Sequence, residues 1–128
     1  MNNARDLIFD LDAFTGGLTQ YSHKLPFTPE LRLTEGAKHF ADKMGAYWLM
    51  DIIATEFLEL LDEENPIIFI SVNIDSANGA LIVATDGDKG GGPVTLHTRH
   101  IEYTDLPRME TPYRFFLQDG VLMLPGEY

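Results

Sequence analysis

The sequence GAYWLMDIIATEFLELLD, residues 45–62, decides how the rest of the chain is interpreted. No glycine or proline interrupts it between residues 47 and 61, and apolar side chains recur at the i, i+3, i+4 and i+7 spacing of one helical face. Further apolar residues widen that face over most of the circumference, which is typical of a helix buried on more than one side. We therefore predict a central buried helix over about residues 46–61, with the only tryptophan, Trp48, as a core anchor.

Acidic residues inside this helix argue against a membrane segment. A membrane-spanning helix needs about 20 mostly apolar residues, and Asp51 and Glu56 interrupt the run. We expect Asp51 to lie on a solvent-facing strip with Thr55. If it faces inward instead, it requires a hydrogen-bond partner, because a buried carboxylate without one is costly.

The part of the chain before the central helix contains two further predicted helices. A short one over residues 2–13 is followed by an irregular stretch over residues 18–33, which contains two prolines and in which we expect His23 to be solvated. The spacing of apolar residues predicts another helix over residues 35–44. We expect Gly45 to form a turn between that helix and the central one.

The pattern of apolar residues changes from helical to β-like after Pro66. Residues 67–74 and 80–85 are rich in β-branched side chains and flank an Asn-Gly pair, which predicts a β-hairpin. Residues 94–104 predict a third strand, and a last hairpin is predicted around an Asp-Gly turn at 119–120. Helices followed by strands indicate an α+β fold. We predict a single domain over residues 1–128, with N-terminal helices packed on a C-terminal antiparallel meander sheet of about five strands.

The composition restricts the classes of function. Nine basic residues against twenty acidic ones give a net charge of −11, which argues against direct nucleic-acid binding and suits a basic protein partner or a cation. The chain has no cysteine, which fits a reducing compartment. Three aspartates in the first twelve residues are unlike a secretory signal. We therefore expect a cytoplasmic protein that does not bind membranes.

Acidic residues are concentrated at the end of the central helix. Carboxylates four residues apart on a helix are separated by about 6 Å along the helix axis. Successive phosphates of one strand of a duplex are separated by about 3.4 Å along the duplex axis. A row of such carboxylates resembles a nucleic-acid backbone crudely and would fit a basic groove; the alternative is a solvated helix edge. The predicted partner-binding residues are Glu56, Glu59, Asp62, Glu63 and Glu64, with Asp86 and Asp88 as a second patch.

The glycine-rich loop DGDKGGG, residues 86–92, is the most suggestive local motif. Asp86 and Asp88 begin it in the manner of a calcium loop, but Gly90 occupies the third acidic position and no glutamate follows at the required distance. The glycines are not followed by the Lys-Ser/Thr pair of a phosphate-binding loop. We therefore favour a hairpin loop without a ligand, and predict no metal and no cofactor.

The strand after this loop carries two histidines. Side chains alternate along a strand, so His100 and Glu102 share one face and His97 and Arg99 share the other. This spacing supplies at most two ligands for a metal ion. No Ser-His-Asp arrangement or nucleophile elbow is visible, so no catalytic residue is assigned and an enzyme is not the favoured interpretation.

Four sequence blocks carry a resemblance to a known family. GAYWLMDIIA at 45–54, ATDGD at 84–88, IEYTDLP at 101–107 and VLMLPGEY at 121–128 together resemble a family of small, uncharacterised bacterial proteins. Members of that family occur in phage and other mobile-element gene neighbourhoods. The resemblance implies a mobile-element origin and a bacterial host cell, and it supplies no activity or catalytic residues.

Three hypotheses about function follow. The first is a small acidic accessory protein of phage or mobile-element origin that occludes a basic surface on host nucleic-acid machinery, as an anti-CRISPR protein or nucleic-acid mimic would. The alternative is a small enzyme or ligand-binding or metal-binding domain with a site near the loop 86–92 and the strand 94–102, using Asp86, Asp88, His97 and His100. The third is a homodimer that pairs through an edge strand at residues 113–117.

Overall fold

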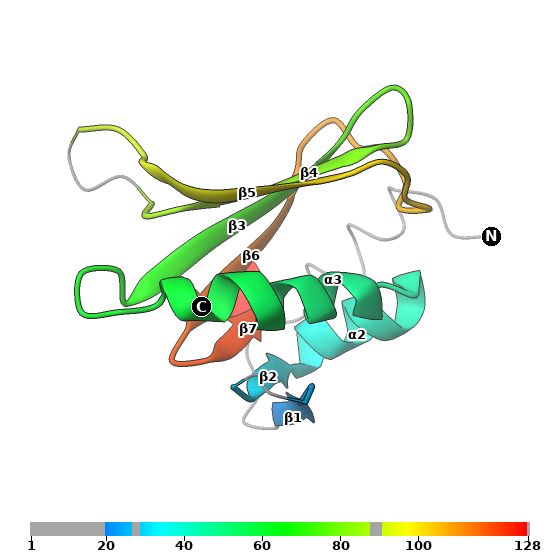
Figure 1. Ribbon diagram of the computed structural model, residues 1–128. Helices are drawn as coiled ribbons and strands as arrows, with labels where there is room; N and C mark the ends of the chain where they lie inside the picture. Colours follow the sequence, from blue (N-terminus) through cyan, green and yellow to red (C-terminus); the bar gives the residue numbers. More distant parts are fainter. Residues whose placement is uncertain (1–19, 27–28, 88–90, 128) are drawn as a thin grey trace.

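The computed structural model describes residues 20–26, 29–87 and 91–127. The helix predicted over residues 2–13 and the candidate ligand Asp88 lie outside these ranges. Within them the protein has two layers, with the helices covering one face of a single sheet (Figure 1). This arrangement confirms the predicted α+β class.

The sheet contains seven strands. They are β1 (Gln20–His23), β2 (Leu31–Thr34), β3 (Ile67–Ile74), β4 (Ala80–Thr85), β5 (Thr95–Ile101), β6 (Tyr113–Gln118) and β7 (Val121–Met123). The spatial order is β1-β2-β7-β6-β3-β4-β5, and every neighbouring pair is antiparallel except β2 and β7, which are parallel. The sheet therefore has two more strands than the predicted meander of about five, and β6 lies beside β3 rather than beside β5 as a meander would place it.

The two extra strands come from the stretch that was predicted to be irregular. β1 and β2 pair with each other from Gln20 with Thr34 to His23 with Leu31, and both prolines of this stretch fall in the connection between them. β2 then joins β7 at the far end of the chain. Strands this short gain their stability from such long-range pairing, which a local pattern does not reveal.

The position of β6 also changes the dimer hypothesis. β6 lies between β7 and β3 inside the sheet, so residues 113–117 are already paired on both sides. An interior strand has no free row of backbone groups to offer a second subunit. The edge strands among the described residues are β1 and β5.

Helix α2 (Glu35–Met44) follows directly after β2 and has the predicted bounds. The Thr34 hydroxyl oxygen accepts a hydrogen bond from the Ala37 backbone N–H at 3.2 Å, as an N-cap does. Gly45 ends the helix in the left-handed region, with φ of 59°, which confirms the predicted turn.

The C-terminal segment closes over the start of α2. Glu127, in the 3₁₀ turn η3 (Pro125–Glu127), accepts hydrogen bonds from the Thr34 hydroxyl at 2.6 Å and from the Gly36 backbone N–H at 3.1 Å. A Cβ atom on Gly36 would lie 2.5 Å from a Glu127 carboxylate oxygen, so a larger residue here would displace the Glu127 side chain. The carboxylate stabilises the positive end of the α2 dipole.

The central helix has the predicted extent but not a uniform geometry. It begins as α3 (Tyr47–Ile52), continues as a π-helical turn η1 (Ile53–Phe57) and ends as a 3₁₀ turn η2 (Leu58–Leu60). Its buried side chains have no exposed surface at Leu49, Met50, Ile53 and Phe57. They pack over the inner face of the sheet, whose buried residues alternate along the strands and include Ile68, Ile70, Val72, Ile82, Phe115 and Leu117.

The two predicted hairpin turns differ in how they are made. Asp119 and Gly120 have φ of 55° and 76°, which is the two-residue turn expected between β6 and β7. Between β3 and β4 only Asn78 has positive φ, at 64°. There Asp75 Oδ1 accepts hydrogen bonds from the backbone N–H groups of Ala77 and Gly79 at 2.8 and 2.9 Å, so an aspartate side chain holds a longer loop.

No helix in the described part of the chain is long and apolar enough to span a bilayer.

Candidate functional site

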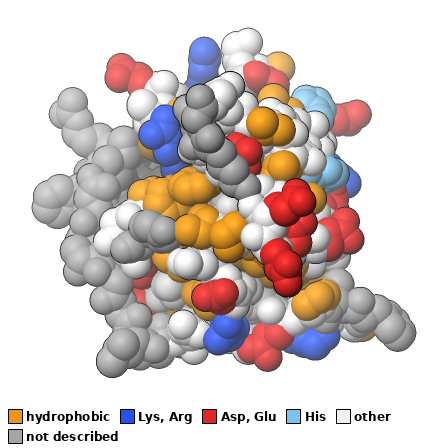
Figure 2. Space-filling model, turned by 90° about the vertical axis from the view of Figure 1, so that its left-hand side faces the viewer, with side chains coloured by type: hydrophobic (Ala, Val, Ile, Leu, Met, Phe, Trp, Pro, Cys, Tyr) orange, Lys and Arg blue, Asp and Glu red, His pale blue; other side chains and the backbone are white. Residues whose placement is uncertain are grey.

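Four predicted acids gather where the central helix leads into β3. Glu59, Asp62, Glu63 and Glu64 are all exposed, and we call this group the acidic end. Asp62 Oδ1 also accepts the Asn65 backbone N–H at 2.7 Å, which fixes the loop. Figure 2 views the molecule from the end at which this connection lies, and it shows acidic side chains beside a hydrophobic area.

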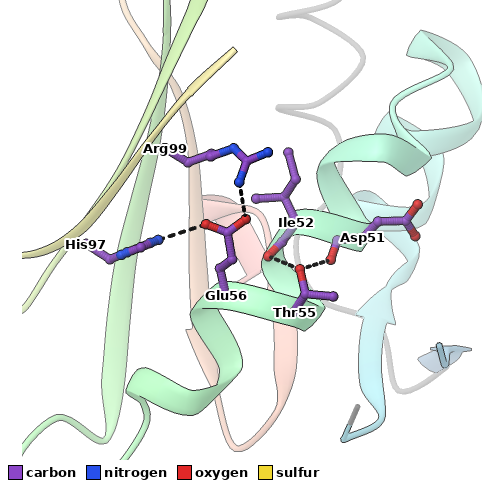
Figure 3. A network of polar contacts seen from close by, with 6 residues as sticks. All are labelled: Asp51, Ile52, Thr55, Glu56, His97 and Arg99. Carbon is purple, nitrogen blue, oxygen red and sulfur yellow. Dashed lines mark hydrogen bonds and ion pairs between the residues drawn. The ribbon is translucent and has the colours of Figure 1, made fainter. Parts of the chain in front are cut away.

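Glu56 does not belong to the acidic end. Its carboxylate lies between the helix and the inner face of β5, where one oxygen is 2.9 Å from His97 Nε2 and the other accepts a hydrogen bond from Arg99 Nη1 at 2.8 Å (Figure 3). The Glu56 side chain is 25% exposed. Its charge is balanced within the fold and contributes little to an acidic surface.

The helical geometry explains why Glu56 leaves the row. The Leu58 backbone N–H bonds to the Ile53 carbonyl five residues back, which widens the turn at this position. At the start of the turn the Thr55 hydroxyl donates to the carbonyls of Asp51 and Ile52, at 2.9 and 3.2 Å, and such bonds compete with the regular helical ladder (Figure 3). Asp51 points away from Glu56 in the same view.

Arg99 is the member of this network that the sequence pattern alone does not place in a site. It stands two residues from His97 on β5, and both face the helix because Ile82 and Ala84, their partners on β4, are buried on the inner face. The sequence feature that could have identified Arg99 is that it shares one face of the strand with His97. What the sequence lacked was the opposing carboxylate, which comes from another element.

Asp86 has a structural role in its loop. Its Oδ1 accepts the Val94 backbone N–H at 2.9 Å, and its own N–H donates to the Val94 carbonyl at 3.1 Å, so it closes the loop between β4 and β5. The proposed second acidic patch paired it with Asp88, which lies outside the described residues. Asp86 is half-buried and is held by the backbone on the opposite side of the loop.

The alternative ligand site also depends on residues from this region. His97 faces the helix, whereas His100 pairs with Leu81 on the opposite face of the sheet and is exposed. Among residues 20–26, 29–87 and 91–127, no group of three or more His, Asp or Glu side chains is placed to hold a metal ion. The described members of this predicted site therefore do not converge.

A second polar network lies at the start of the central helix and corrects the expectation for His23. Its Nε2 is 2.7 Å from Asp51 Oδ1, its ring stacks on Tyr47 with centroids 5.8 Å apart, and its side chain is only 17% exposed. The strand pairing of β1 brings it there. The half-exposed Asp51 is thus neither fully solvated nor buried without a partner.

Lys38 connects α2 to the same region. Its Nζ lies 2.8 Å from Asp42 and 3.2 Å from the Tyr47 hydroxyl, which also donates to Asp42. The Asp42 hydrogen bond is the main reason why the pKa of Lys38 is raised, and the same bond lowers the pKa of Asp42. Because these groups satisfy one another, they serve to hold α2 and α3 together.

These features define a small α+β protein with a mostly antiparallel sheet, helices on one face and exposed acids at one end. The chain belongs to the DUF6876 family, a family of unknown function, which it matches over residues 6–128. No curated protein and no solved structure is significantly similar to it. Membership confirms that the chain comes from an uncharacterised family.

Proposed function

We propose that this protein is a small acidic accessory factor of phage or mobile-element origin that binds a basic surface on a host protein. Its target would be nucleic-acid-handling defence machinery, such as a CRISPR interference complex. The observation that carries the proposal is the acidic end, where four exposed carboxylates lie within six residues. No lysine or arginine occurs in residues 45–88 of the sequence, so this stretch of the chain carries only negative charge.

The position of these acids supports a role in binding, although Asp62 also holds the loop after the helix. They lie at the C-terminal end of a helical run, where the helix dipole is negative and acidic side chains are unfavourable. Exposed carboxylates contribute little to stability, but they steer a basic partner toward the surface. Such an interaction weakens as salt screens the charges.

A pull-down with the purified protein as bait tests the proposal. A bacterial lysate is passed over the bait, which is washed at low and then at high salt, and released proteins are identified. We expect a basic nucleic-acid-handling protein that is released by salt. A variant with Glu59→Lys, Asp62→Lys and Glu63→Lys is expected to lose this partner.

A matched variant separates the acidic end from overall charge. Glu30→Lys, Glu102→Lys and Glu110→Lys change exposed acids elsewhere. Both variants have a net charge of −5, because each of three reversals adds two to −11. The control is expected to retain the partner. Retention by the acidic-end variant as well would refute the electrostatic proposal.

A further inference from the structure

A hollow lies at the other end of the central helix, away from the acidic end. It is formed between the first turns of α3 and the connection from β5 to β6, and has a volume of about 470 Å³. This is within the usual range of roughly 300–1,000 Å³ for ligand sites. Its walls are mostly apolar and include Trp48, Asp51, Ile52, Tyr103, Asp105 and Leu106.

Two carboxylates face this hollow without a balancing cation in its walls. Asp51 and Asp105 both line it, and no lysine or arginine is among the lining residues in the part of the chain that the structure describes. The hollow is therefore complementary to a cation and hostile to an anion. Two carboxylates alone do not make a metal site, since Ca²⁺ takes six to eight oxygen ligands.

Each carboxylate is held by a neighbouring side chain. Asp51 Oδ1 pairs with His23 Nε2 at 2.7 Å; since an ionised carboxylate only accepts, this nitrogen donates. The Tyr103 hydroxyl donates to Asp105 Oδ1 at 3.0 Å, and this bond raises the pKa of Tyr103. An ionised carboxylate accepts about four hydrogen bonds. Both groups are thus oriented and retain acceptor capacity for a ligand.

The aromatic residues favour a planar organic cation over a hydrated one. Trp48 lines the hollow, and Tyr103, which is 65% exposed, stands at its rim. A guanidinium group stacks on aromatic faces, donates in a fork to carboxylates and is more weakly hydrated than an ammonium group. Its apolar stem matches walls such as Ile52 and Leu106.

We infer that this hollow binds the guanidinium group of an arginine side chain presented by a partner protein. That the arginine belongs to a protein rests on the proposed function. The site itself is separate from the acidic end and would give a basic partner a second, more specific contact. Charge steers the encounter, while aromatic stacking and paired carboxylates select arginine.

The only tryptophan in the chain gives this site its own signal. We would titrate the full protein with the blocked peptide acetyl-Leu-Arg-Leu-amide and follow Trp48 fluorescence. The control peptide replaces arginine by citrulline, which has nearly the same shape and no charge. We expect the arginine peptide to change the emission and to bind at least about tenfold more tightly than the citrulline peptide.

Two variants test the carboxylate. Asp105→Asn is expected to weaken the arginine peptide about tenfold, because it replaces a charged acceptor by a neutral one. Glu102→Gln removes an equal charge three residues away, outside the lining of the hollow, and is expected to leave binding unchanged. Far-UV circular dichroism and the unfolding midpoint confirm that both variants fold.

The remaining outcomes each overturn the inference. Equal binding of the two peptides would make the hollow an apolar site, and an equal effect of the two variants would reduce it to general electrostatics. Agmatine, the free guanidino-amine, would indicate a small-molecule site if it bound as tightly as the peptide. No fluorescence response in any titration removes the arginine site but leaves the salt-sensitive pull-down, and hence the proposed function, unaffected.

Discussion

Glu56 and Glu59 are the same residue type, three positions apart on one helical run, and the fold uses them in opposite ways. Glu56 is held between His97 and Arg99 of β5 and is one-quarter exposed. Glu59 is exposed and begins the acidic end. The π-helical turn and the edge strand separate them, because together they place one carboxylate opposite two nitrogen donors and leave the other in solvent.

The comparison shows that an acidic residue in the sequence does not always add negative charge to the surface of the folded protein. Of the seven acids predicted to bind a partner, Glu56 is balanced by two side chains and Asp86 closes a loop through the backbone. Among the described ones, the four acids of the acidic end are exposed and lie within six residues of the chain, in a region without basic residues. An acidic binding surface is therefore smaller and more local than the composition indicates.

The largest effect is expected from Phe57→Ala, which tests the packing around Glu56. Phe57 has no exposed surface and meets the His97 ring edge-to-face, with centroids 5.3 Å apart. Its removal leaves a cavity beneath the Glu56 network, and we expect a loss of about 3–5 kcal/mol in the free energy of unfolding, measured in urea. Leu81→Ala, at a side chain that is 41% exposed, is the control and should cost less than about 1 kcal/mol. Similar losses in both variants would mean that Phe57 does not anchor this region.

A charge substitution tests the comparison directly. Glu56→Gln keeps the size of the side chain and removes the charge that two donors share, so we expect a loss of about 1–2 kcal/mol, moderated by partial exposure. Glu59→Gln should change stability by less than about 0.5 kcal/mol. A double-mutant cycle with Arg99→Gln should show coupling to Glu56 and none to Glu59. Equal effects of the two glutamine variants would break the distinction between the two acids.

The smallest expected effect concerns an acid that the backbone holds. Hydrogen bonds from the N–H groups of Gly79 and Ala77 lower the pKa of Asp75 below its usual value of 3.8. Its contribution to stability is therefore present above that value and is lost as the pH falls through the lower pKa of the folded state. Asp75→Asn keeps an acceptor but does not titrate. Unfolding midpoints measured between about pH 5 and pH 2 should fall less steeply for the variant than for the natural protein; parallel curves would show that Asp75 is not the group responsible.

Much of the fold could be predicted because its signals are local. The bounds of α2, β3 and β4 match their sequence patterns residue by residue, and Gly45 ends α2 as predicted. The strands β1 and β2 could not be predicted in this way. They are four residues long, prolines lie between them, and their pairing partners include β7, almost ninety residues further along the chain.

Among the candidate sites too, only those with a local sequence signal could be predicted. Exposure of the acidic end follows from a run of charged residues that no core can accommodate. The Glu56 network, the His23–Asp51 pair and the hollow at Trp48 each combine residues from two or three elements far apart in sequence. No spacing rule within one element identifies such groups.

The sequence by itself determined the class of fold, the extent of the central helix and the excess of negative charge, since these depend on local periodicity and on composition. Only the tertiary structure decided which acids are balanced, how the sheet is ordered and where a hollow with two carboxylates forms. The physical reason is that hydrogen bonding, burial and charge pairing act over a few ångströms in space. Residues that are distant in the chain become neighbours only when the helices pack across the strands.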